Sequence, residues 1–255
     1  MPFEKIQPEK LSQSVIKQIE LLILRGVLRP GERLPSEREL SDRFGVSRPS
    51  LREAISELQD TGLLTAKANS GVFVGDVLGS AFSPALTRLF ANHSEAVFDY
   101  IAFRRDMEGL AAERATRLAS NTDLEVVDRI FQKMEAMHKK RNPTDEARLD
   151  AEFHLAIIEA SHNVVMLHMM RSMYDLLRGG VFYNRKIMFQ QKTTRGMLLD
   201  QHRAINDALQ ARDTKAARKA VETHMDFISS ELSDYLKAEK NERIAQQRLQ
   251  HEAER

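Results

Sequence analysis

Two predicted helices constrain the fold of this 255-residue chain more than any other feature, because only Val46 separates the stop residue of the first, Gly45, from the N-cap of the second, Ser47. The run Ser36-Glu37-Arg38-Glu39 has the form of a capping box and predicts a short helix, with Gly45 as its stop. Ser47 is a new N-cap, and Pro49 stands in the first turn of the helix that it opens. Two helices that are joined by a tight glycine turn predict a helix-turn-helix.

The flanking segments complete a small domain. Residues 11–25 carry an apolar stripe at helical spacing, which predicts a further helix before the helix-turn-helix. After it, residues 62–67 and 72–74 have the pattern of two short strands around Asn69-Ser70-Gly71, a turn-rich tip. The expected fold of residues 1–75 is therefore a winged helix-turn-helix.

Arginines recur through this region although the net charge of the whole chain is only +1. Arg48 and Arg52 are four residues apart, so they share one helix face, opposite the apolar positions Leu51, Ile55 and Leu58. Arginine suits both phosphates and guanine edges, but the spacing alone fits a solvated helix face equally well. Charge and spacing leave both interpretations open.

Three segments of this domain resemble the GntR family of regulators: Leu34-Pro35-Ser36-Glu37-Arg38-Glu39-Leu40, Gly45 to Ile55, and Gly71-Val72-Phe73-Val74. The resemblance implies a DNA-binding surface made of Arg38, Ser47, Arg48, Ser50, Arg52, Ser70 and Gly71. The sequence Ala68-Asn69-Ser70 lacks the glycines or the His-Gly of relatives that read the minor groove with the wing. We therefore expect a weaker or altered contact at the wing tip.

The second half of the chain is predicted to be an antiparallel bundle of six or seven helices, so the whole fold is mainly α. From Phe82 onward apolar residues recur at spacings of three and four, and breaks fall near residues 120, 142, 162, 179 and 212. We expect a linker at 76–83, a helical domain at 84–236 that binds effector and metal and dimerises, and a charged tail at 237–255, either frayed helix or solvated.

Four side chains in this half form a candidate metal site. Asp150 and His154 are one helical turn apart, and His202 and His224 lie on separate amphipathic segments. On spacing alone, four such residues are more often unrelated surface or core groups. The run Phe-His-Leu-Ala-Ile at 153–157, with Glu-Ala-Ser-His-Asn after it, resembles the FCD ligand-binding domain of the FadR-type branch. The resemblance implies a divalent transition metal on all four residues, with zinc first and nickel or manganese as alternatives.

A carboxylate-binding arginine is the second element of the expected sensing site. The resemblance places Arg104 where family members hold an effector carboxylate, whereas a surface pair of Arg104 or Arg105 with Glu108 is the alternative. Together with the metal, Arg104 would suit a small 2-hydroxy or 2-keto acid. The overall resemblance is to regulators of lactate, glycolate and pyruvate metabolism.

Composition narrows the classes of function. The chain has no cysteine, so disulfides, thiolate ligands and cysteine nucleophiles are excluded, and no apolar run is long enough to cross a bilayer. The first residues lack the apolar core of a secretory signal, so a cytoplasmic location is expected. We expect a homodimeric repressor or activator, not an enzyme, that binds double-stranded operator DNA. A purely structural metal and a metalloenzyme domain are the competing hypotheses.

Overall fold

The computed structural model describes residues 10–67, 70–76, 82–93, 95–140, 142–178 and 192–253. The chain forms two compact units, residues 1–81 and 82–255, and the boundary between them falls within the predicted linker. The predicted turn residues Ala68 and Asn69 and the break at Gly179-Gly180 lie outside the described residues. Within the described part no helix is long and apolar enough to span a membrane.

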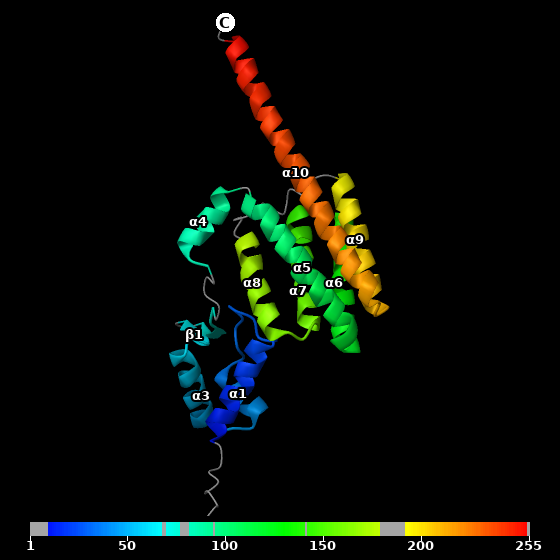
Figure 1. The fold of residues 1–255 in the computed structure, drawn as a ribbon. Helices are drawn as coiled ribbons and strands as arrows, with labels where there is room; N and C mark the ends of the chain where they lie inside the picture. Colours follow the sequence, from blue (N-terminus) through cyan, green and yellow to red (C-terminus); the bar gives the residue numbers. More distant parts are fainter. Residues whose placement is uncertain are drawn as a thin grey trace, which may run out of the picture. The chain divides into compact units, whose positions relative to one another are not determined.

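The first unit is built from three helices and a hairpin (Figure 1). The helices are α1 (Leu11–Leu24), α2 (Glu37–Phe44) and α3 (Arg48–Asp60), and the strands β1 (Leu64–Lys67) and β2 (Gly71–Val74) pair antiparallel, with Leu64 opposite Val74. Both α1 and α2 pack on α3. The apolar core takes residues from every one of these elements.

The turn between α2 and α3 forms for the reasons that the sequence indicates. The Ser36 hydroxyl accepts a hydrogen bond from the backbone N–H of Glu39 at 3.3 Å and so caps α2. Gly45 ends that helix in the left-handed region at φ 65°, a conformation that glycine adopts without strain. The Ser47 hydroxyl then accepts from the N–H of Ser50 at 3.3 Å and starts α3. The predicted helix-turn-helix geometry is confirmed.

The second unit is a helical bundle with no strand among its described residues. Its helices are α4 (Pro84–Asn92), α5 (Glu95–Leu118), α6 (Asn121–Lys140), α7 (Pro143–Ala160), α8 (Val164–Arg178), α9 (Lys192–Gln210) and α10 (Thr214–Ala253). Helix α5 packs against α7 and α10, α6 against α7 and α9, and α9 against α10 (Figure 1). The mainly α fold class is confirmed, and the apolar core of the bundle takes residues from all helices from α5 to α10.

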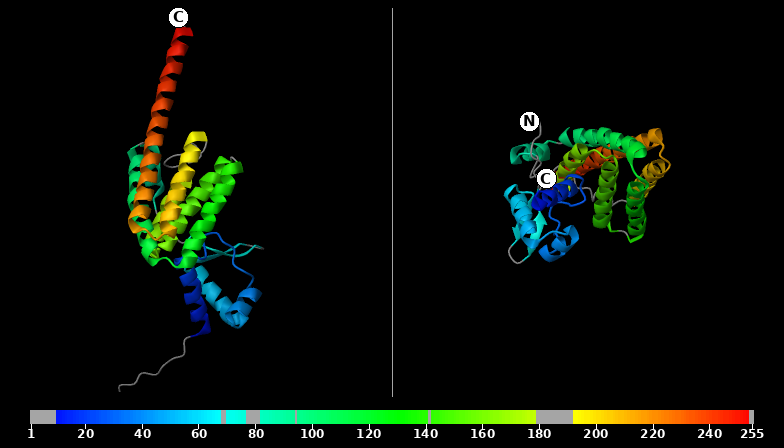
Figure 2. Two further views of the ribbon diagram at one scale, coloured as in Figure 1. Left: turned by 90° about the vertical axis from the view of Figure 1, so that its right-hand side faces the viewer. Right: turned by 90° about the horizontal axis from the view of Figure 1, so that it is seen from below.

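Helix α10 continues without a break through residue 236, where the sequence led us to expect a tail to begin. Its last part, from Lys237 to Ala253, is helical and almost wholly exposed, and it extends past the bundle in Figure 1 and in the left view of Figure 2. The helix persists because residues 214–253 contain neither glycine nor proline, and because pairs such as Lys237 with Asp234 support the exposed turns.

Candidate DNA-binding surface and metal centre

The predicted DNA-binding residues lie on one side of α2 and α3 and on the wing. Arg38, Ser47, Arg48, Arg52, Ser70 and Gly71 are exposed and Ser50 is half-buried. On α3 the exposed arginines face away from Leu51, Ile55 and Leu58, which are buried in the core. The structure therefore presents these side chains to solvent, while their contact with DNA stays a prediction.

One of these arginines has an internal partner. The Arg52 guanidinium donates from Nε to Glu37 Oε2 at 2.8 Å, and its side chain is still 68% exposed. An exposed ion pair contributes little free energy, so a phosphate or a guanine can replace Glu37 at little cost. The pair links α2 to α3 at the surface.

Gly71 is needed at the wing for a conformational reason. Its φ is +99°, and a Cβ placed on it would meet the Arg33 guanidinium at 3.3 Å from Nε. Arg33 also forms an isolated bridge with Phe73 and so adds one residue to the edge of the hairpin. A side chain at position 71 would therefore strain the backbone and push Arg33 away from the wing.

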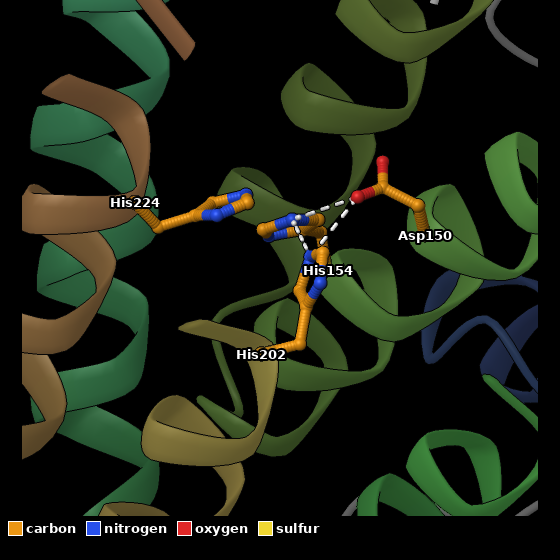
Figure 3. Close-up of side chains that lie close together, drawn as sticks. All are labelled: Asp150, His154, His202 and His224. Carbon is orange, nitrogen blue, oxygen red and sulfur yellow. Dashed lines mark hydrogen bonds and ion pairs between the residues drawn. The ribbon is translucent and has the colours of Figure 1, made fainter. Parts of the chain in front are cut away.

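The four predicted metal ligands meet inside the second unit (Figure 3). Asp150 and His154 come from α7, His202 from α9 and His224 from α10. All four are at most 2% exposed, and one ligand atom from each lies within 4.8 Å of those of the other three. Residues that are up to 74 positions apart in sequence are thus brought together by the packing of three helices.

The ligand atoms of Asp150, His154 and His202 lie at distances close to those that a metal ion requires. His202 Nε2 lies 3.0 Å from Asp150 Oδ1 and 3.3 Å from His154 Nε2, and His154 Nε2 lies 3.7 Å from Asp150 Oδ1 (Figure 3). Ligands of a tetrahedral zinc ion with bonds of about 2.1 Å are about 3.4 Å apart. Three imidazoles and one carboxylate also form a donor set that suits a divalent transition metal. The residues present fit such an ion.

Two of the imidazoles have a side-chain oxygen close to Nδ1. His154 Nδ1 lies 2.6 Å from Glu108 Oε2, and His224 Nδ1 lies 3.0 Å from Gln201 Oε1. A proton on Nδ1 satisfies both contacts and leaves the Nε2 lone pair of each ring available to the cluster. Burial lowers the pKa of His154 against the opposing effect of Glu108, which favours the neutral imidazole that binds metals.

Arg104 points into the bundle, where it belongs to a buried network. Its Nε donates to Glu108 Oε1 at 2.7 Å, and its Nη2 donates to the Tyr174 hydroxyl at 2.7 Å. Tyr174 in turn donates to Glu108 Oε1 at 2.8 Å, and Arg104 is 0% exposed. The pair of Arg104 with Glu108 exists, as the alternative proposed, but in the interior. Its neighbour Arg105 binds Asp226 at the surface.

Burial and charge act in opposite directions on this network. Burial alone would raise the pKa of Glu108, but the positive charge of Arg104 and the contact with His154 lower it well below its usual value. Burial raises the pKa of the Tyr174 hydroxyl well above its usual value, so it stays protonated and can donate. Glu108 is therefore a buried carboxylate, and it is stabilised by Arg104 on one side and His154 on the other.

A small, partly open hollow with room for about one water molecule lies beside the cluster and reaches His202. Its walls combine two apolar side chains, Met134 and Leu199, with the ion pair between Glu146 and Arg195, both of which are less than a tenth exposed. Arg195 Nε donates to Glu146 Oε2 at 2.8 Å. The hollow brings solvent-accessible space to one of the predicted metal ligands.

Sequence reasoning missed three residues of this site: Glu108, Tyr174 and Gln201. Glu108 was weighed only as the surface partner of an arginine four residues away, and nothing local connects it to His154. Gln201 is adjacent to His202, but its partner His224 is on the next helix. A carboxylate or amide close to a predicted ligand is the only signal that the sequence offers for such residues.

The fold and the site together define a class of protein: a regulator with a helix-turn-helix for DNA and a separate helical domain with a buried cluster of ligand-type side chains. Comparison with known proteins agrees with this. Residues 11–74 match the bacterial regulatory proteins of the gntR family, and residues 99–227 match the FCD domain. The chain belongs to the GntR family of transcriptional regulators, in its branch with an FCD domain.

Similar proteins include two regulators from Escherichia coli strain K12. One, described as a putative L-lactate dehydrogenase operon regulatory protein, is 32% identical over 90% of this chain and 89% of its own length. The other, the Glc operon transcriptional activator, is 30% identical over 90% and 92%. The solved structure of a GntR protein from Streptococcus agalactiae aligns with 86% of this chain and 99% of its own chain. The TM-score is 0.51 and the sequence identity 21%, which shows a shared fold.

Proposed function

We propose that this regulator binds operator DNA as a homodimer in the cytoplasm, and that a small 2-hydroxy or 2-keto acid, bound at a metal in the FCD domain, controls its affinity for the operator. Lactate, glycolate and pyruvate are the effectors to test first. The convergence of three imidazoles and one carboxylate in the interior of that domain is the observation that carries the proposal.

The DNA-binding part rests on the exposed arginines of the helix-turn-helix. Arg48 and Arg52 share the outer face of α3, and Arg38 is exposed on α2. A recognition helix enters the major groove with its N-terminal turn, where arginine can make bidentate bonds to guanine. Ser47 and Ser50 stand at that end of α3, and Ser70 and Gly71 at the wing add a contact beside it.

The metal would be held by Asp150, His154, His202 and His224. Zinc fits the tetrahedral spacing, and nickel or manganese would use the same donors with additional ligands. The bound metal supplies a positive centre for a carboxylate and for a neighbouring hydroxyl or keto oxygen. Arg104 would bind the effector carboxylate, for which it would have to share its guanidinium with Glu108 and Tyr174.

The name of one relative supports the class of effector. The Escherichia coli protein of the L-lactate dehydrogenase operon is similar along nearly the whole of this chain, including the FCD domain. Lactate is a 2-hydroxy acid of the kind that can chelate a metal through two adjacent oxygens. We therefore place lactate first in the test.

A structural metal is the second candidate, because the ligands tie three helices together and are all buried. Under that hypothesis a metal stabilises the domain but no effector changes operator affinity. Both hypotheses predict the same metal affinity. They make different predictions only for the operator affinity after an acid is added.

The deciding experiment measures thermal stability and operator affinity of the same protein. Metal-loaded protein is screened with lactate, glycolate and pyruvate, with and without a chelator, for a rise in melting temperature. An acid that stabilises only the metal-loaded protein and changes the operator Kd supports the sensor. If none of the three acids changes either quantity, the proposed effector class is wrong.

A further inference from the structure

Glu108 lies between the two parts of the proposed sensing site. Its Oε1 accepts hydrogen bonds from Arg104 Nε at 2.7 Å and from the Tyr174 hydroxyl at 2.8 Å. Its Oε2 lies 2.6 Å from His154 Nδ1. The side chain is 2% exposed, so these three neighbours replace water as its partners. One carboxylate thus connects the arginine proposed for the effector with a residue proposed for the metal.

The short contact to His154 favours one ring nitrogen as the carrier of the proton. A carboxylate oxygen repels an imidazole lone pair, so the 2.6 Å between His154 Nδ1 and Glu108 Oε2 favours a proton on Nδ1. In the neutral ring this leaves the lone pair on Nε2, which lies 3.3 Å from His202 Nε2 and 3.7 Å from Asp150 Oδ1. The correct nitrogen therefore points into the cluster before any ligand binds.

Arg104 and Tyr174 keep Glu108 in the orientation that this requires. Oε1 of Glu108 accepts hydrogen bonds from Arg104 Nε and from the Tyr174 hydroxyl, and these two bonds fix the carboxylate so that Oε2 faces His154. The three residues come from two helices, α5 and α8, that carry none of the four predicted ligands.

We propose that Glu108 is the positioning residue of the metal centre: it fixes His154 in the Nδ1–H tautomer and so raises the affinity of the cluster for a divalent metal. This inference rests on the proposed function, because it concerns the same site. It assigns Arg104 a second role, since an effector that binds Arg104 would also act on the support of a metal ligand. Metal and effector affinities would then be coupled in both directions.

The first test determines the tautomer of His154 directly. Long-range ¹⁵N–¹H spectra of metal-free, ¹⁵N-histidine-labelled protein show which ring nitrogen of each histidine is protonated. His154 is expected as the Nδ1–H tautomer, and Glu108→Gln is expected to shift it toward a mixture of tautomers. An Nε2–H tautomer at His154 in the wild-type protein overturns the inference.

The second test measures zinc affinity by competition with a chromophoric chelator. Loss of an outer-shell partner of a histidine ligand weakens metal binding about 10–100-fold, and we expect that loss for Glu108→Gln. The double variant Arg104→Met/Glu108→Leu replaces the buried ion pair with apolar side chains and should keep the fold, with the same loss of affinity. Circular dichroism checks that both variants are folded.

Glu146→Gln is the matched control. Glu146 is also a buried carboxylate with an arginine partner in the same bundle, but it contacts Arg195 and His138 and none of the predicted ligands. The Glu146→Gln variant should be less stable than the wild type, and its zinc affinity should stay within about twofold of the wild type. Zinc affinity that falls equally in Glu146→Gln and Glu108→Gln, or that falls in neither, overturns the inference while the metal site stands. A wild-type protein that binds no divalent metal overturns the proposed function itself.

Discussion

The two units of this regulator use charge in opposite ways. In the first unit, Arg48 and Arg52 are exposed on α3, and no charged side chain among the described residues of that unit is buried. In the second, Arg104, Glu108 and Asp150 are almost completely buried. An exposed charge needs no partner in the free protein, whereas a buried one must be compensated by neighbours or by a bound ion. The proposed DNA-binding site thus consists of exposed charged residues. The proposed site for the metal and the effector consists of buried ones.

The largest effect is expected from His202→Ala. Removal of one of four ligands should weaken zinc binding by more than the roughly 100-fold that an outer-shell partner contributes. Under the sensor hypothesis the response of the operator Kd to the acid is lost as well, while operator binding without effector is retained because the first unit folds on its own core. Chelator competition and operator titration measure the two quantities. An intact acid response in this variant would contradict the proposed site.

Leu51→Ala tests whether the units are energetically separate. Leu51 is 0% exposed in the core of the first unit, so its truncation should cost about 2–5 kcal/mol of unfolding free energy. We expect the loss in the unfolding transition that removes operator binding, with zinc affinity unchanged. Chemical denaturation followed by operator binding and by zinc release distinguishes the two units. A parallel loss of zinc affinity would show that the units are coupled.

The variants Arg48→Ala and Arg52→Ala test whether the exposed arginines of α3 bind the operator. Each should reduce operator affinity by about 1–3 kcal/mol if the side chain reads a base, and neither should change thermal stability much. Arg117→Ala, an exposed arginine paired with Glu113 on α5, is the matched control and should leave the operator Kd unchanged. Specific operator binding that survives in the double variant Arg48→Ala/Arg52→Ala would refute the proposed recognition face.

The smallest effect concerns Ser47, which both caps α3 and stands at the proposed DNA surface. Ser47→Ala should lose about 1 kcal/mol of stability because the N–H of Ser50 loses its acceptor. Ser47→Asp keeps a capping oxygen but adds a negative charge facing the phosphates, so stability is retained and operator affinity falls. Thermal melts and operator titration of the two variants separate the cap from the contact. Equal operator affinity in both would place Ser47 outside the interface.

The sequence predicted well whatever depends on local chemistry. Ser36, Gly45 and Ser47 act within three residues of themselves, and the structure shows the caps and the turn that they predict. The four predicted ligands also meet, although spacing alone could not show this and the family resemblance carried the prediction. The residues that contact the predicted ligands could not be predicted. Glu108, for example, lies beside His154 only because α5 packs on α7. The same limit applies to Tyr174, which reaches Arg104 across 70 positions of sequence.

Because helix α10 is uninterrupted, a small change in its angle near the cluster produces a larger displacement at its exposed end. His224 lies in its buried part and Ala253 at its exposed end, 29 residues further on, so a straight helix puts them about 44 Å apart at about 1.5 Å per residue. A tilt of only about 5° at His224 would move the far end by about 4 Å. If zinc binding tilted α10 at His224, the displacement would be largest at the exposed end, and spin labels near Ala253, measured with and without zinc, test this.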